Sequence, residues 1–98
     1  MAGRREFEWD DAKARANLAK HGVSFDYAAR IFLDSGVVEF DASREGDAEV
    51  RQKAVGLIEG KLLVVVFTDR GGNCRIISAR RANTKERRGY EAVHSRSE

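Results

Sequence analysis

Two short segments of this chain carry side chains suited to chemistry on a phosphodiester. Lys20 and His21 stand side by side in the first quarter of the sequence, and Arg80 and Arg81 stand together in the segment 76–82. The planar guanidinium group of arginine can bond two phosphoryl oxygens, lysine supplies a compact positive charge, and histidine exchanges protons near neutral pH. If the two segments meet in space, they form a cationic site that contains an acid or base.

Cleavage of RNA is a reaction that such a site can support without a metal ion. The ribose 2′-hydroxyl attacks the adjacent phosphorus, which gives a cyclic phosphate and frees a 5′-hydroxyl. The protein must orient this attack, neutralise the added negative charge and move protons. The sequence has no phosphate-binding glycine loop and no dinucleotide fingerprint, and Gly71 and Gly72 indicate a turn. Two distant histidines and one cysteine do not predict a metal site, and we expect no cofactor.

Each of these residues also has a purely structural interpretation. His21 can cap the end of a helix, a role compatible with chemistry, and Lys20 can be a solvated surface charge. Arg80 and Arg81 can hold the segment that follows them. Glu86 is expected to pair with a neighbouring base.

Length and composition predict one small domain. The chain has 98 residues, of which 42% are apolar and 35% charged, and we expect a single domain over 1–98 with frayed ends at about 1–5 and 95–98. Cys74 is the only cysteine, which excludes a disulfide framework and fits a reducing cytoplasm. The longest apolar run, 62–67, is too short to span a bilayer, so we expect no membrane contact.

The net charge of +2 hides an uneven distribution of charge along the chain. Acids dominate the segment 34–49, and bases dominate the segment 75–88. This pattern predicts an anionic partner for one surface and a cationic partner for another, with two solvated faces as the alternative.

The element expected to position Lys20 and His21 is a short N-terminal helix. Asp10 or Asp11 can cap its start by accepting bonds from free backbone N–H groups. Gly22 suits the left-handed conformation that ends a helix, which leaves the lysine and the histidine in the last turn.

A second helix and several strands follow this first helix. Ser24 can cap a helix over 25–33, where apolar residues recur at helical spacing. The remaining expected elements are a strand start at 7–9, strands over 37–41, 50–59, 61–69 and 74–81, a hairpin turn at 70–73, and a final helix capped by Thr84 and running to about His94.

Strict alternation along the last strand divides its side chains between two faces of the sheet. One face receives Ile76, Ser78 and Arg80, and the other receives Arg75, Ile77, Ala79 and Arg81. Helices packed on one face leave the other partly open. The side chains expected to line that open face are Arg51, Lys53, Ser78 and Arg80.

Together these segments resemble the BrnT family, the ribonuclease toxins of bacterial type II toxin–antitoxin systems. The matching pieces are FEWDDAKARANLAKHGVSFDYAARIF (7–32), VRQKAVG (50–56) and GKLLVVVFTDRGGNCRIISARRANTKERRGYE (60–91). The resemblance implies a RelE-like α+β fold: a small antiparallel sheet, two N-terminal helices packed on one face, and a C-terminal helix. It also implies metal-independent cleavage of RNA.

The resemblance also carries expectations for site residues. It implies catalytic roles for His21, Arg51, Arg80 and Lys20, with the two arginines on the scissile phosphate, the histidine as acid or base, and the lysine assisting electrostatically. The residues expected to contact RNA are Lys53, Ser78, Arg81, Glu86, Arg87 and Arg88, of which Arg81 is held in reserve because alternation points it away from Arg80.

The implied protein partner is a BrnA-type antitoxin with a ribbon–helix–helix DNA-binding domain, in a toxin–antitoxin heterotetramer that represses its own operon. DNA would be contacted only through the antitoxin, and RNA would be the substrate. One alternative is a non-catalytic interaction partner that acts as a co-repressor of the antitoxin. A DNA-binding protein is less favoured, because the net charge is modest.

Overall fold

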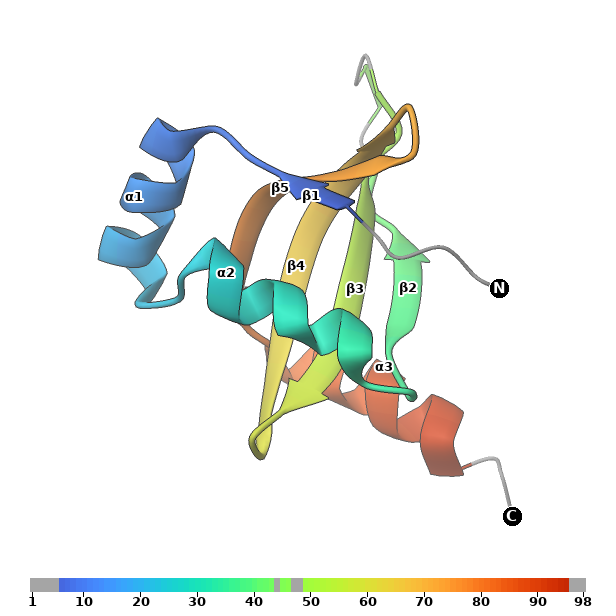
Figure 1. Ribbon diagram of the computed structural model, residues 1–98. Coiled ribbons are helices and arrows are strands. Elements are labelled where there is room, and N and C mark those ends of the chain that lie inside the picture. Colours follow the sequence, from blue (N-terminus) through green and yellow to red (C-terminus); the bar gives the residue numbers. More distant parts are fainter. Residues whose placement is uncertain (1–5, 44, 47–48, 96–98) are drawn as a thin grey trace.

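The computed structural model describes residues 6–43, 45–46 and 49–95. Of the expected frayed ends 1–5 and 95–98, residues 1–5 and 96–98 lie outside the described residues, and Ser95 is the last residue of a helix. Figure 1 shows one curved sheet with α1 and α2 on one side and α3 across the other. The predicted α+β class, with two N-terminal helices and one C-terminal helix, is confirmed. The elements are β1 (Glu6–Glu8), α1 (Asp11–His21), α2 (Phe25–Ala28), the 3-10 helix η1 (Ala29–Leu33), β2 (Val38–Asp41), β3 (Gln52–Ile58), β4 (Lys61–Arg70), β5 (Asn73–Arg81) and α3 (Thr84–Ser95).

The five strands form one sheet in the order β1-β5-β4-β3-β2. Neighbours from β2 to β5 pair antiparallel, whereas β1 pairs parallel with β5. β1 covers only Asn73 to Arg75 of β5. The rest of that edge of β5 is therefore open to other contacts.

The N-terminal helices begin and end at the predicted residues. The Asp10 carboxylate accepts a hydrogen bond from the N–H of Lys13 at 3.0 Å, and the Ser24 hydroxyl accepts one from the N–H of Tyr27 at 3.1 Å. Gly22 ends α1 with a φ of 71°. The predicted second helix forms as one α-helical turn, α2, that continues as η1.

A β-bulge in β5 changes the predicted division of its side chains. The register between β4 and β5 shifts by one residue beyond the Val66–Ser78 pair, which leaves Ile77 as the extra residue. Ile76 therefore packs in the same core as Ala79. The prediction that Ile76 shares a face with Ser78 is wrong, because it assumed a regular strand.

The two arginines at the end of β5 do point to opposite faces, as predicted. Arg80 lies opposite Val64 and Arg81 lies opposite Leu63, and these two β4 side chains belong to different cores. Arg75, which lies before the bulge, does not share the face of Arg81, so its predicted side is wrong for the same reason.

The sheet carries a core on each face. The larger core lies under α1, α2 and η1, on what we call the helix side, and the smaller lies under α3, on what we call the α3 side. The face predicted to be open is thus partly covered by α3. Fully buried members of the helix-side core include Phe25, Ile31, Leu63, Phe67 and Ile76, and the α3-side core contains Val55, Leu62 and Val64 packed against Phe40 and Tyr90.

α3 begins with a reciprocal cap between Asn83 and Glu86. The N–H of Glu86 donates to the Asn83 side-chain oxygen at 2.8 Å, and the N–H of Asn83 donates to Glu86 Oε1 at 2.9 Å. This capping box takes the role predicted for Thr84, which is instead the first helical residue. The side chain of Glu86 is therefore committed to the start of α3.

A buried side chain, Asn17, joins α1 to the open edge of β5. Its Nδ2 donates to the carbonyl oxygens of Val23 at 3.0 Å and Ala79 at 2.8 Å, and its Oδ1 accepts from the N–H of Ala79 at 3.1 Å. The amide group thus pairs with β5 where a neighbouring strand is missing. This contact holds the C-terminal half of α1, and with it His21, against the sheet.

We expect Asn17→Ala to lower the free energy of unfolding by about 1 to 3 kcal/mol, because the substitution leaves buried backbone groups of Val23 and Ala79 without partners. Urea denaturation measures this loss. Lys13→Ala, on an exposed position of the same helix, is the matched control and should leave the midpoint unchanged. Equal midpoints for both variants would contradict the role given to Asn17.

Candidate functional site

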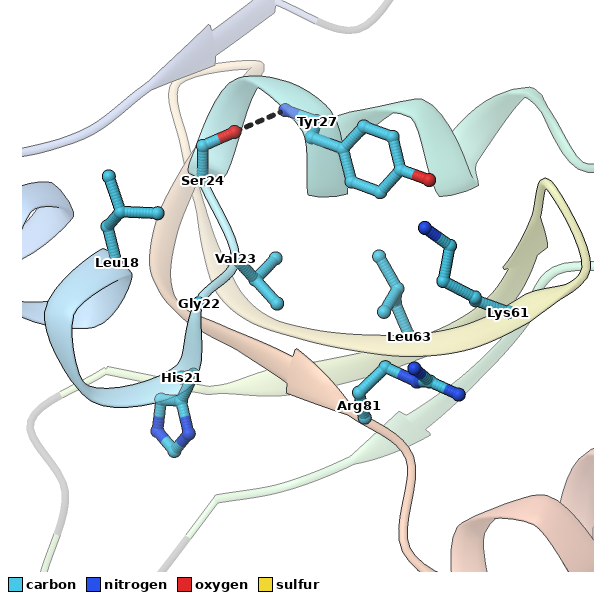
Figure 2. Close-up of a pocket in the computed structure, with 9 residues that line it drawn as sticks. All are labelled: Leu18, His21, Gly22, Val23, Ser24, Tyr27, Lys61, Leu63 and Arg81. Carbon is cyan, nitrogen blue, oxygen red and sulfur yellow. Dashed lines mark hydrogen bonds between the residues drawn. The ribbon is translucent and has the colours of Figure 1, made fainter.

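A pocket of about 450 Å³ opens on the helix side, between the end of α1 and the β4–β5 pair. Its volume lies within the range of roughly 300 to 1,000 Å³ that is typical of small-ligand pockets. We call it the His21 pocket. Figure 2 shows the residues that line it, which are Leu18, His21, Gly22, Val23, Ser24, Tyr27, Lys61, Leu63 and Arg81.

The local sequence explains how one wall of this pocket forms. Gly22 ends α1 in the left-handed conformation, and Ser24 caps α2 two residues later, so the chain turns sharply between the helices. His21 is left exposed in the last turn of α1, where the helix dipole favours positive charge. Val23, within the turn, is buried and adds apolar surface.

The other wall comes from β4 and β5. Arg81 and Leu63 face each other across the two strands. Lys61 lies two residues before Leu63 on β4 and therefore projects from the same face of the sheet. The bulge in β5 leaves this relation intact, because the pairing from Val66–Ser78 to Leu63–Arg81 keeps a regular register.

The charged lining of the His21 pocket is entirely basic. Lys61 and Arg81 join the imidazole of His21, and the lining contains no aspartate or glutamate. Within the described part of the chain, none of these three side chains takes part in an ion pair. A concave surface with unpaired cations attracts anions, so this pocket suits a phosphate group.

A second group of charged side chains lies on the α3 side, and we call it the Glu86 cluster. The two Nη atoms of Arg80 donate to the two carboxylate oxygens of Glu86 at 2.8 Å each, and Lys53 Nζ donates to Oε2 at 3.1 Å. The side chain of Glu86 is 4% exposed, against 32% for Arg80. The predicted pairing of Glu86 with a neighbouring base is confirmed.

The Glu86 cluster shifts the protonation of its members. The Arg80 guanidinium, assisted by the N–H of Asn83 and the ammonium of Lys53, lowers the pKa of Glu86 to about 2, although burial acts in the opposite direction. The bond to Glu86 also raises the pKa of Arg80. Much of the charge of Arg80 is therefore matched by a buried carboxylate.

The structure separates the residues predicted to be catalytic. His21 lies at a pocket on the helix side, whereas Arg80 is held by Glu86 on the α3 side. Lys20 is exposed beside His21. Arg51 directly precedes β3, and its carbonyl extends the pairing with β2 by accepting the N–H of Ala42 at 2.9 Å.

The residues predicted to contact RNA are divided in the same way. Ser78 and Arg80 share the α3 side with Lys53, and alternation along β3 places Arg51 there as well. Arg81 is the exception, because it lines the His21 pocket. Two further arginines are exposed on α3, Arg87 and Arg88. The roles of all these residues in RNA binding stay predictions.

Lys61 and Tyr27 are among the lining residues that were not predicted as site residues. Neither belongs to a recognisable motif, and each stands in a segment that the sequence assigns simply to a strand or a helix. The sequence does show that Lys61 and Leu63, two residues apart, share one face of a strand. This spacing points to the pocket only once the pairing of Leu63 with Arg81 across β4 and β5 is known.

No group of three or more His, Cys, Asp or Glu side chains is arranged to hold a metal ion within residues 6–43, 45–46 and 49–95. In that same part of the chain, no helix is both long enough and apolar enough to cross a membrane. The expectations that the protein uses no metal and does not contact a membrane stay predictions.

Comparison with known families gives a match over most of the chain. A family model described as the ribonuclease toxin BrnT of type II toxin–antitoxin systems matches residues 9–86. No curated protein matches the chain. The matched region includes all lining residues of the His21 pocket and the whole Glu86 cluster, and it ends before Arg87 and Arg88.

Proposed function

Because this chain belongs to the BrnT family of ribonuclease toxins of type II toxin–antitoxin systems, we propose that it is an endoribonuclease that cleaves RNA at the His21 pocket without a metal ion. The family match over residues 9–86 is the observation that carries the activity. The charged side chains that line the pocket are all basic, which supports its location, since RNA presents one phosphate per nucleotide.

The roles follow from the chemistry of each side chain. Arg81 binds the non-bridging oxygens of the scissile phosphate and stabilises the charge that develops on them. His21, at the rim, acts as the general base that takes the 2′-hydroxyl proton or as the general acid that protonates the leaving 5′-oxygen. The 2′-oxygen bonds to phosphorus as the bond to the 5′-oxygen breaks. Lys20 adds positive potential beside His21.

The α3 side is proposed as an RNA-binding surface rather than as the reaction centre. The bidentate bond from Arg80 to buried Glu86 favours a positioning role for Arg80, because that guanidinium already has a carboxylate partner. The cluster of one acid and two bases still leaves an excess of positive charge. Arg51, Lys53, Ser78, Arg87 and Arg88 would extend this surface along the strand of RNA.

The family implies an antitoxin protein as the partner of this chain. We extend this to a BrnA-type antitoxin with a ribbon–helix–helix domain, in a heterotetramer that meets DNA only through the antitoxin. The resemblance of the sequence to BrnT toxins supports this extension, and action on cellular RNA places the toxin in the cytoplasm.

Incubation of the purified protein with RNA in buffer that contains EDTA tests the proposed reaction. We expect cleavage to continue at an unchanged rate, with 2′,3′-cyclic phosphate and 5′-hydroxyl ends on the products, because the protein's own cations replace a metal ion. Loss of cleavage in EDTA with recovery on addition of Mg²⁺, or 5′-phosphate ends, would contradict the mechanism.

The non-catalytic alternative makes a different prediction in cells. We expect a small DNA-binding partner protein whether the chain is a ribonuclease or a non-catalytic co-repressor. Only a ribonuclease is expected to arrest growth when this chain is expressed alone, with rescue by the co-expressed antitoxin. RNA that is bound but not shortened by the purified protein would favour the co-repressor.

A further inference from the structure

Lys61 and Tyr27 line the His21 pocket but have no part in the cleavage proposed above. The Tyr27 hydroxyl donates to Glu59 Oε1 at 2.6 Å, which fixes the orientation of the ring. The ammonium of Lys61 lies 5.0 Å from the centroid of that ring, a distance typical of cation–π contact. Glu59 itself is occupied by Tyr27 and by Arg30, whose Nη2 lies 3.6 Å from Oε2.

Among the described residues Lys61 forms no ion pair with a carboxylate, although its charge interacts with that of Glu59 at longer range. The close contact that positions its ammonium is the one with the neutral Tyr27 ring. A cation held in this way keeps its full charge and its three N–H donors for an incoming anion. The same contact also restricts the flexible lysine side chain before any ligand arrives, which lowers the entropy lost on binding.

Lys61 and Arg81 are diagonal neighbours on one face of the β4–β5 pair. Arg81 lies opposite Leu63, and Lys61 lies two residues away from Leu63 on the same strand. Diagonal positions are separated by roughly 7–8 Å, which long side chains can bridge. Figure 2 shows both side chains beside Leu63, with the Lys61 ammonium turned toward the Tyr27 ring and His21 on the other side of Val23 and Gly22.

Between these charged groups the pocket offers apolar surface and a hydroxyl donor. Val23 and Leu63 are buried and contribute the apolar part. The Ser24 hydroxyl oxygen accepts the N–H of Tyr27, so its own hydrogen is available to a ligand. Cations at two positions with an apolar surface between them match a nucleoside flanked by phosphates.

We propose that the His21 pocket binds two successive phosphates of one RNA strand, with Arg81 on the scissile phosphate, which is the 3′ phosphate of the bound nucleoside, and Lys61 on the 5′ phosphate of the same nucleoside. The nucleoside between them lies against Val23 and Leu63. This inference rests on the proposed function for the identity of the ligand as RNA. Lys61 is then an RNA-binding residue that sets the position of the RNA strand, and the Tyr27 ring holds the Lys61 side chain in place.

Two classes of small probe test this proposal by calorimetry, in EDTA and low salt. Nucleoside 3′,5′-bisphosphates carry both phosphates, and nucleoside 3′-monophosphates carry one; each is used with all four bases. We expect the second phosphate to tighten binding to the wild-type protein by about tenfold or more for at least one base. Lys61→Met should remove this gain and leave monophosphate binding unchanged.

Lys13→Met is the matched control, because Lys13 is exposed on α1 and does not line the pocket. It should keep the full gain from the second phosphate. Equal affinity of the wild-type protein for both probes with every base, or a gain that survives Lys61→Met, would overturn the proposal. Urea denaturation of each variant confirms that it is folded.

An RNA cleavage assay run in parallel separates this proposal from the function it rests on. Cleavage that depends on His21, together with no preference for bisphosphates, rejects the second phosphate site alone. A bisphosphate preference that depends on Lys61, in a protein that cleaves no RNA, rejects the ribonuclease function and keeps the site.

Discussion

Replacing His21 with alanine is expected to slow RNA cleavage by about 100- to 10,000-fold, because a positioned general acid or base typically contributes this much to the rate. The same variant should no longer arrest growth. The fold should survive, since His21 is exposed and its side chain makes no hydrogen bond to the described part of the chain. A gel assay with purified protein measures the rate, and urea denaturation checks the fold.

His94 provides the matched control, because it is the other of the chain's two histidines. Its Nε2 lies 2.7 Å from the carbonyl oxygen of Gly36, and the centroid of its ring lies 4.2 Å from that of Tyr90. His94 therefore packs against these two residues, and it has no proposed role in cleavage. His94→Ala should cleave RNA at nearly the wild-type rate per folded molecule. Equal cleavage rates for His21→Ala and the wild-type protein would contradict the role of His21.

The second large effect concerns stability. Glu86→Gln is expected to lower the free energy of unfolding by about 3 kcal/mol near pH 7, because it leaves Arg80 and Lys53 without the buried carboxylate that both contact. The exposed fractions of these two bases place the expected loss at the lower end of values for buried pairs. Urea denaturation measures the change, and an unaltered midpoint would contradict the importance of the Glu86 cluster.

The pH dependence of this effect has a definite sign. The pKa of Glu86 is about 2 in the folded protein, because of Arg80 above all, and its usual value is 4.5. A lowered pKa means that the contribution is complete above about pH 4.5 and is lost as the pH falls toward 2, by roughly 3 kcal/mol in total. The stability difference between wild type and Glu86→Gln should therefore shrink steadily across this window.

Glu49→Gln is the control for Glu86. Glu49 forms a bidentate pair with Arg70, but both side chains are almost half exposed. Solvent weakens such surface pairs, so the control should change stability only slightly. A larger loss for Glu49→Gln than for Glu86→Gln would show that burial does not decide the strength of these pairs.

The elements of this fold were largely predictable because their boundaries depend on local chemistry. Asp10, Gly22 and Ser24 act on backbone groups within a few residues, so their sequence positions determine where α1 begins and ends and where α2 begins. The hairpin between β4 and β5 likewise follows from adjacent glycines with positive φ at Gly71 and Gly72.

The candidate site was less predictable, because it depends on contacts between distant segments. The bulge at Ile77 reflects the pairing of β5 with β4 and leaves no mark in the spacing of the residues themselves. Alternation predicts that Arg80 and Arg81 face opposite sides of the sheet, but it does not tell which side holds which partner. Only the positions of α3 and α1 decide that one meets Glu86 and the other joins His21.

The central claim is that RNA is cleaved at the His21 pocket, and the neighbouring arginines of β5 test it most directly. Arg81→Ala and Arg80→Ala are compared with wild type in one RNA cleavage assay, with rates corrected for the folded fraction from urea denaturation. We predict that Arg81→Ala loses about 100- to 1,000-fold in rate at unchanged stability, whereas Arg80→Ala loses stability and retains most of its rate. A folded Arg81→Ala that cleaves RNA normally, beside an Arg80→Ala that does not, would contradict the account.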